Sequence, residues 1–198
     1  MPSAITKIGI INRGLQLLGQ PSISSLNENS RGARSMIRAY DSIFLSELEA
    51  NTWGFSIRRA NLAADATAPV NGNKSYYPLP ADFLYMAPQE TSLGPTGRID
   101  YDFENFNDTL CVVSGLSTPL EIRYVSSSTT ESVFSGTFAE AFATALALAC
   151  CEDITDSGSK KMSLERGYKD AVQRAKKRND IQRGPTKSPT CSWISVRD

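Results

Sequence analysis

Apolar residues in the first fifty positions recur at helical spacing. From Ser3 to Leu18 they are separated by steps of four and three, which predicts an α-helix with Ser3 as its N-cap and Gly19 just beyond its end. A second repeat of the same kind runs from about Ala33 to Asn51 and predicts a longer helix. The apolar positions are Ala4, Ile8, Ile11, Leu15 and Leu18 in the first helix and Ala33, Ile37, Tyr40, Phe44 and Leu48 in the second.

The middle of the chain changes to a period of two. Residues 55–63 are expected to be extended, the prolines of the stretch 76–83 exclude an ordinary helix, and residues 109–113 are compact and rich in residues that favour strands. Apolar residues alternate with polar ones at Ile99, Tyr101 and Phe103 and again at Leu120, Ile122 and Tyr124. This pattern predicts a small β-subdomain with short strands and long loops.

Helical spacing returns at about Ser135, where apolar residues nearly encircle the predicted helix. A bundle of four helices at most is expected to leave part of this surface uncovered, as an interface between subunits. A last helix is predicted to reach about Ile181, with its apolar residues turned inward and its lysines outward. The residues expected to point inward are Met162, Tyr168, Ala171, Val172 and Ala175.

Together these segments predict an α+β fold. It is mostly a bundle of about four helices, built from residues 1–54 and 134–182, with the β-subdomain inserted at residues 55–133. Residues 183–198 contain prolines and little apolar content, and they predict an extended C-terminal arm.

Composition removes several classes of chemistry. The chain has 198 residues and no histidine, which excludes Ser-His-Asp and Cys-His enzymes and metal sites built on imidazole. The four cysteines lack Cys-x-x-Cys spacing and are interpreted as reduced thiols rather than metal ligands. They are Cys111, Cys150, Cys151 and Cys191. We therefore expect no metal and no cofactor.

Charge is divided unevenly along the chain. The totals balance, with 21 basic and 21 acidic residues, but residues 1–157 carry 10 basic and 17 acidic side chains while residues 158–198 carry 11 basic and four acidic ones. The basic segment suits phosphates, an acidic protein surface, or the acidic part of a neighbouring copy. No apolar run approaches the length of a membrane span, so no membrane partner is expected.

Two groups of charged residues are candidates for a functional role. The acidic residues on predicted helix faces are Glu47, Glu49, Glu140, Glu152 and Asp153. A glycosidase needs two such carboxylates opposite each other, one with a raised pKa, but acids on helices are usually solvated, so no catalytic residue is assigned. Arg31, Arg34 and Arg38 line one side of the second helix. They form either a solvated face paired with acids such as Asp41 or a docking strip for carboxylates or phosphates.

Several stretches, taken in order, resemble the tail tubular protein A, or head-to-tail adaptor, family of short-tailed bacteriophages. The resemblance covers almost the whole chain. Its motifs are Leu15-x-x-Leu18-Gly19, Ile23-x-Ser25-Leu26, Ala33 to Tyr40-Asp41, Asn51-Thr52-Trp53-Gly54-Phe55 with Arg58-Arg59-Ala60-x-Leu62-Ala63, Tyr77-Pro78-Leu79-Pro80-Ala81-Asp82-Phe83-Leu84, Ile122-Arg123-Tyr124-Val125, Phe138-x-x-Ala141-Phe142-x-x-x-Leu146-Ala147 and Trp193-Ile194-Ser195-x-Arg197.

The resemblance implies a structural protein of the virion and no enzyme. Members of the family assemble in the host cytoplasm as a dodecameric ring beneath the portal protein, at the head-tail junction. The ring continues the channel, through which genomic DNA passes without sequence-specific binding, and it provides the platform for the tail nozzle protein. The family fold is a helical bundle interrupted by a small β-domain, in agreement with the pattern above.

The resemblance also assigns roles to particular residues. Trp53, Phe55, Pro80, Asp82 and Phe83 belong to motifs expected to be structural. The C-terminal arm is expected to meet the portal or a neighbouring subunit, with Trp193 as an anchor, because this tryptophan has no local core to join. The other candidate partner-binding residues are Ile194, Arg197, Arg183, Arg31, Arg34 and Arg38.

Two alternative functions stay open at this point. One is a cell-wall or polysaccharide hydrolase associated with the phage tail and dependent on two carboxylates, such as Glu47 and Glu140. The other is a DNA-binding module that uses the basic C-terminal region, although no aromatic residues interleave with its basic run.

Overall fold

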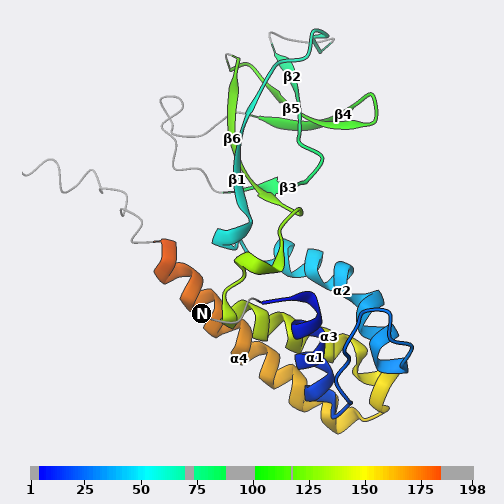
Figure 1. Cartoon of the computed structure of the whole chain (residues 1–198). Helices are drawn as coiled ribbons and strands as arrows, with labels where there is room; N and C mark the ends of the chain where they lie inside the picture. Colours follow the sequence, from blue (N-terminus) through cyan, green and yellow to red (C-terminus); the bar gives the residue numbers. More distant parts are fainter. Residues whose placement is uncertain (1–4, 70–73, 88–100, 117, 184–198) are drawn as a thin grey trace, which may run out of the picture. The chain divides into compact units, whose positions relative to one another are not determined.

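The computed structural model describes residues 5–69, 74–87, 101–116 and 118–183, and Figure 1 shows the chain. The described part contains four α-helices, which make up about half of the described residues, and two small antiparallel sheets of three strands each. The predicted α+β fold is therefore confirmed. The arm expected at residues 183–198 lies outside the described residues, apart from Arg183, which ends the last helix.

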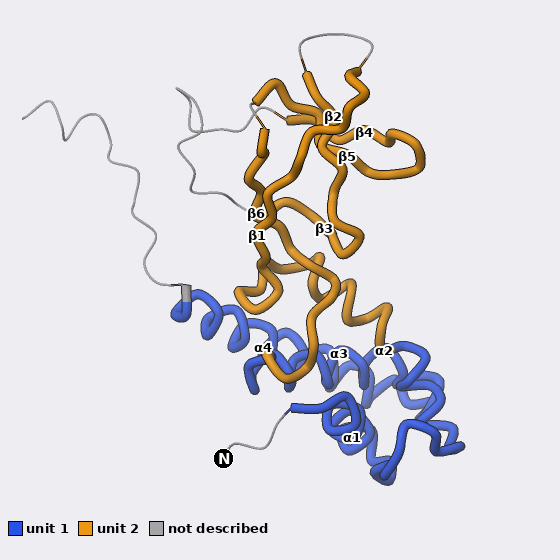
Figure 2. Tube along the Cα trace, turned by 45° about the horizontal axis from the view of Figure 1, so that its top comes forward, with its two compact units in different colours: residues 1–39, 134–198 blue, residues 40–133 orange. Residues whose placement is uncertain are grey.

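The chain divides into two compact units, coloured separately in Figure 2. We call residues 1–39 with 134–198 the helical unit and residues 40–133 the β unit. The division falls inside the second helix, whereas the sequence pattern places it after residue 54. The boundaries expected at residues 54, 133 and 182 stay a prediction.

Helix α1 of the helical unit, Lys7–Leu18, has a polar residue at one end and a glycine at the other. Thr6 has an extended backbone and its side chain accepts a hydrogen bond from the backbone N–H of Gly9, 3.1 Å away. Thr6 is therefore the N-cap, and the expectation that Ser3 caps this helix is wrong. Gly19 ends the helix with a left-handed φ of 71°, as its position in the sequence predicts.

Three longer helices follow the same capping rules. Helix α2, Arg31–Ala50, begins after Ser30, whose hydroxyl accepts from the N–H of Ala33. Helix α3, Gly136–Thr155, begins after Ser135, whose hydroxyl accepts from the N–H of Phe138. Helix α4, Gly158–Arg183, follows after only two residues, so α3 and α4 form a helical hairpin and pack along each other (Figure 1).

Helix α3 is the centre of the helical unit. Every residue from Ala141 to Ala147 is buried, which covers all sides of nearly two helical turns. Helices α1 and α4 pack against it, and Gly14 shows how closely, because a methyl group at Gly14 would lie 3.2 Å from the backbone oxygen of Ala143. The expectation that part of this surface stays uncovered as a subunit interface is therefore wrong for Ala141–Ala147, since small side chains let the neighbouring helices approach closely. Ala149 alone among the apolar residues expected on this helix is exposed.

Helix α4 is buried along one side only. Leu164, Ala171 and Ala175 are buried, and Tyr168 and Val172 are half-buried. Met162 was expected to point inward, but it is 59% exposed. The reason is geometric, because two residues separated by two positions in a helix, such as Met162 and Leu164, point about 200° apart.

The β unit contains two sheets. One has the strand order β1-β6-β3, made of Ile57–Leu62, Leu120–Ser126 and Phe83–Met86, and the other has the order β2-β5-β4, made of Ser75–Pro78, Thr109–Ser114 and Asp102–Phe106. All neighbouring strands are antiparallel. Strand β3 is not predicted by the sequence pattern, because its four residues are half-buried and show no alternation.

A single apolar cluster forms the core of these sheets. Tyr77 and Val112 are almost fully buried in it, and the phenolic hydroxyl of Tyr77 donates to the backbone oxygen of Leu116 at 2.6 Å. The other buried members are Leu62, Leu79, Leu120, Ile122 and Tyr124. The alternation at Leu120, Ile122 and Tyr124 thus marks the inward face of β6, as predicted.

Candidate functional site

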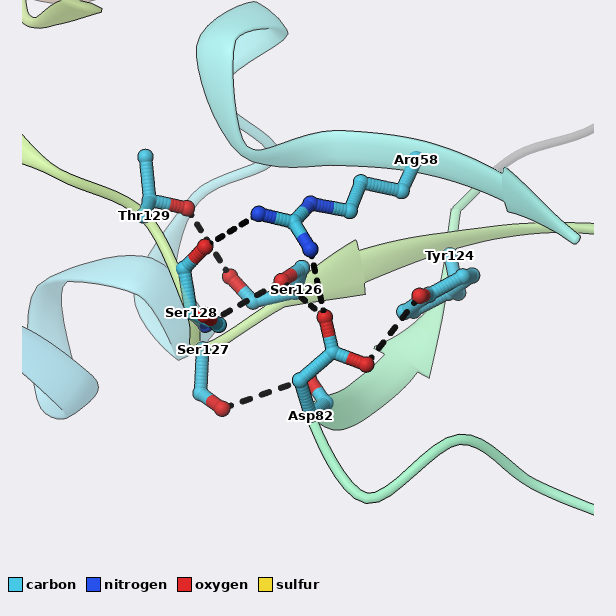
Figure 3. Close-up of polar contacts among 7 residues, drawn as sticks. All are labelled: Arg58, Asp82, Tyr124, Ser126, Ser127, Ser128 and Thr129. Carbon is cyan, nitrogen blue, oxygen red and sulfur yellow. Dashed lines mark hydrogen bonds and ion pairs between the residues drawn. The ribbon is translucent and has the colours of Figure 1, made fainter.

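The densest polar network in the β unit is centred on Asp82, at the start of β3 (Figure 3). Its carboxylate accepts hydrogen bonds from Tyr124 at 3.1 Å and from Ser126 at 2.5 Å, both on β6. Arg58, on β1, donates to the same carboxylate at 3.1 Å. The backbone oxygen of Asp82 accepts from the N–H of Ser127 at 2.8 Å. One aspartate therefore joins all three strands of this sheet.

The electrostatics of Asp82 follow from these partners. Burial favours the neutral acid, but the hydrogen bonds from Ser126 and Tyr124 and the positive charge of Arg58 outweigh it and lower the pKa of Asp82. The pKa of Tyr124 is raised, by burial first and then by the neighbouring carboxylate. A carboxylate held ionised by three donors is a structural cross-link between these strands.

The remaining motif residues pack into the β unit. Trp53 is 1% exposed, stacks on Phe55 with ring centroids 6.2 Å apart, and donates its indole N–H to the backbone oxygen of Glu47 at the end of α2. Phe83 stacks on Tyr124, and its N–H donates to the backbone oxygen of Pro80. These contacts give every motif residue expected to be structural a packing or hydrogen-bonding role.

The three arginines of α2 lie exposed on the helical unit. Arg31 forms an ion pair with Asp153 of α3 at 3.5 Å, and Arg34 donates to Asn29 at 2.7 Å. A hydrogen bond from Ser35 lowers the pKa of Asp153, burial opposes this change, and interactions with Arg31 and Arg38 lower the pKa further. Because the guanidinium groups remain accessible, both interpretations of this strip, solvated face and docking surface, stay open.

Helices α1 and α3 are joined by a two-point ion pair. Arg13 donates to both oxygens of Glu140, at 2.7 Å and 2.9 Å. These hydrogen bonds outweigh burial, and together with the charges of Arg13 and Arg174 they lower the pKa of Glu140. Glu140 also borders a groove of about 310 Å³, which is lined as well by Lys160, whose ammonium group donates to the backbone oxygen of Leu18.

The candidate carboxylates are distributed over both units. Glu140 and Asp153, in the helical unit, have lowered pKa values, whereas a general acid needs a raised one. Glu152 pairs with Lys161 at 2.6 Å. Glu47 is buried and Glu49 is exposed, and both belong to the β unit. The three candidate carboxylates of the helical unit, Glu140, Glu152 and Asp153, thus each have a basic neighbour.

Other features of the described chain bear on ligands and membranes. Cys111, Cys150 and Cys151 are free thiols and buried, as the cysteine spacing predicts, while Cys191 lies outside the described residues. No group of three potential metal ligands occurs among the residues that the structure describes. Within those same residues, no helix combines the length and the apolar character that a membrane crossing demands.

The candidate residues of the arm are placed only at its beginning. Arg183 is the last residue of α4, and Trp193, Ile194 and Arg197 lie outside the described residues. The contacts that sequence reasoning missed join distant positions, such as Arg13 and Glu140, which are 127 residues apart. No local sequence pattern predicts an ion pair between residues so far apart in the chain.

Comparison with known proteins adds no assignment. Neither a protein-family model nor a curated protein sequence matches this chain.

Proposed function

We propose that this protein is a head-to-tail adaptor of a short-tailed bacteriophage. In this role it docks as a ring beneath the portal protein, continues the DNA channel and carries the tail nozzle. It acts through binding surfaces rather than through catalysis. Its place is the neck of the virion, and its assembly takes place in the host cytoplasm.

The observation that carries the proposal is the order of the elements. A helical unit built from both ends of the chain is interrupted by a small β unit, which is the arrangement that the resemblance implies. The motifs on which the resemblance rests occupy defined positions in this arrangement, with Trp53 closing α2 and Asp82 joining the strands of one sheet.

The division of charge also supports a role in assembly. Residues 158–198 hold a basic excess that suits an acidic partner surface, and they include the arm. Because α3 is covered by its own chain along Ala141–Ala147, the proposed ring contacts are sought on other surfaces. The exposed arginines of α2 are a second candidate contact with the portal.

Electron microscopy of the purified protein mixed with its portal tests the proposal. The expected result is twelve-fold density added to the base of the portal. Portal particles that remain unchanged at saturating concentrations of the protein would contradict it. Zymography on peptidoglycan and polysaccharide tests the hydrolase alternative, with Glu47→Gln and Glu140→Gln as controls, and we expect no clearing.

A further inference from the structure

The two compact units carry opposite net charges. The β unit, residues 40–133, has 12 acidic and five basic side chains, and the helical unit has 16 basic and nine acidic ones. The net charges are therefore −7 and +7, although the whole chain is neutral. Two copies of such a chain do not repel each other as wholes, and each offers a surface that attracts the opposite unit of the other copy.

The positive charge of the helical unit is concentrated on the exposed side of α4. Arg166, Lys169, Lys176 and Lys177 lie on the side of this helix opposite Leu164 and Ala175. None of these four cations forms an ion pair with another described residue. We call them the basic face of α4. Two large apolar side chains are exposed near its ends, Met162 at 59% and Ile181 at 63%.

The β unit presents an acidic surface on the hairpin formed by β4 and β5. Asp102, Glu104 and Asp108 are exposed there, and β4 is an outer strand of its sheet because it pairs only with β5. Lys74 offsets part of this charge through its ion pair with Asp102 at 3.4 Å. The hairpin also exposes two large apolar side chains, Phe103 at 45% and Leu110 at 47%. We call this the acidic hairpin.

We propose that the basic face of α4 binds the acidic hairpin of a second copy of this chain. The two surfaces match in length, because the stretch from Arg166 to Lys177 covers about 17 Å of helix and the five residues of β4 cover about 17 Å of strand. Both also expose apolar side chains beside charges that are mainly of one sign, Phe103 and Leu110 on the hairpin and Met162 and Ile181 just beyond the two ends of the stretch from Arg166 to Lys177. A helix is about 10 Å wide. A helix that lies along β4 can therefore contact side chains on both faces of the sheet at this outer strand.

A protein partner suits the basic face of α4 better than nucleic acid does. Asp170 and Asp180 are exposed on the same helix and reduce its positive charge, which weakens a contact that depends almost entirely on charge, as a phosphate backbone does, more than one that apolar side chains share. The exposed Met162 and Ile181 also have no role in contacting phosphates, whereas apolar side chains are ordinary components of a protein interface.

The proposed contact joins two different surfaces, so it is a head-to-tail contact. Contacts of this kind close into a ring when the rotation between copies permits and otherwise extend as a filament. The inference deepens the proposed function, on which it rests for the ring, by naming the two surfaces through which neighbouring copies meet. The two proposals can fail separately. Contact between copies is measured on the purified protein without portal, whereas binding to the portal is measured by electron microscopy of the mixture.

Reversal of charge on each surface tests the proposal. The first variant carries Lys169→Glu, Lys176→Glu and Lys177→Glu, and the second carries Asp102→Lys, Glu104→Lys and Asp108→Lys. Self-association is measured by sedimentation velocity at low ionic strength, where exposed charges are least screened. We expect wild-type protein to associate and to dissociate as salt is added. Each variant alone should associate about tenfold more weakly or worse, and an equimolar mixture of the two should recover association.

A matched control separates the surface from the net charge. The variant Arg59→Glu changes the net charge by the same amount as Lys176→Glu but alters an exposed position of β1, so it should associate like wild type while Lys176→Glu associates more weakly. Circular dichroism checks that every variant is folded. The proposal is overturned if wild-type protein stays monomeric at low salt, if the mixture associates no better than its components, or if the control variant loses association equally. Loss of duplex DNA binding in the first variant, with self-association intact, would also overturn it by assigning this face to a polyanion.

Discussion

Asp82 accepts hydrogen bonds from Arg58, Tyr124 and Ser126 through its carboxylate. Replacing it with asparagine removes the negative charge while keeping the shape, so Ser126, Tyr124 and Arg58 lose a charged acceptor. The side chain is 20% exposed, and hydrogen bonds to a charged group at such a site stabilise appreciably. We expect Asp82→Asn to lower the free energy of unfolding by about 2 kcal/mol in urea titrations followed by tryptophan fluorescence.

The same substitution should change how stability depends on pH. Because the pKa of Asp82 is lower in the folded protein, its stabilising contribution is present above the pKa of the unfolded state and is lost as pH falls through the folded pKa. The acid side of the stability profile should therefore be flatter in Asp82→Asn than in wild type. Asp108→Asn is the matched control, because Asp108 is exposed and has no comparable network. Equal effects of the two substitutions would contradict this role for Asp82.

Two glycines should respond to alanine in opposite directions. Gly19 has a φ of 71°, which an alanine adopts only with strain, so Gly19→Ala should destabilise the helical unit by about 1 kcal/mol. Gly167 lies inside α4 with open space around its Cα, so Gly167→Ala should stabilise by about 0.5 to 1 kcal/mol through helix propensity. Thermal unfolding of both variants measures the difference, and a shift of the same sign for both would refute the assignment.

At the scale of elements, Arg13 and Glu140 join α1 to α3. Their side chains are 41% and 38% exposed, so solvent screens the pair, and we expect a coupling of only about 0.5 to 1 kcal/mol despite the good geometry. A double-mutant cycle with Arg13→Ala and Glu140→Gln measures it through urea unfolding. The coupling should shrink when the salt concentration is raised. A coupling that is zero at low salt would show that the two helices are held by apolar packing alone.

Local signals in the sequence located most of the elements. Gly19 ends α1, Ser135 precedes α3, and the alternation through Ile122 follows the burial of β6, because each of these features depends only on neighbouring residues. Strand β3 lacks such a signal. The N-cap of α1 was misplaced because Ser3 and Thr6 both suit that role, and only the start of the helix decides between them.

Features that depend on packing between elements were not predictable in this way. The burial of α3 depends on the close approach of α1 that Gly14 permits. The sequence around Gly14 does not indicate which helix packs against this glycine. The exposed position of Met162 follows from which side of α4 faces α3. The network around Asp82 joins residues from positions 58 to 127, so its partners become visible only in the folded sheet.

At the scale of the whole molecule, the opposite charges of the two units are the feature that local patterns conceal. The sequence shows an acidic first part and a basic end, but the compact units divide the charge differently, because the helical unit draws on both ends of the chain. A neutral chain with units of opposite sign is suited to assembly with copies of itself, and such assembly should weaken with salt. Self-association that weakens as salt is added depends on charged contacts, whereas self-association through apolar surface would not weaken in this way.

The arm provides the last prediction, which tests the proposed role in the virion. The sequence of residues 184–198 contains two prolines and little apolar content before Trp193, so we expect their deletion to leave the circular dichroism spectrum and the unfolding midpoint unchanged. Binding to immobilised portal should be lost. Trp193→Ala alone should weaken binding about tenfold or more, because buried aromatic anchors dominate interfaces, whereas the neighbouring Ser192→Ala should bind like wild type. Surface plasmon resonance measures all three variants, and wild-type affinity in the truncated protein would remove the arm from the portal interface.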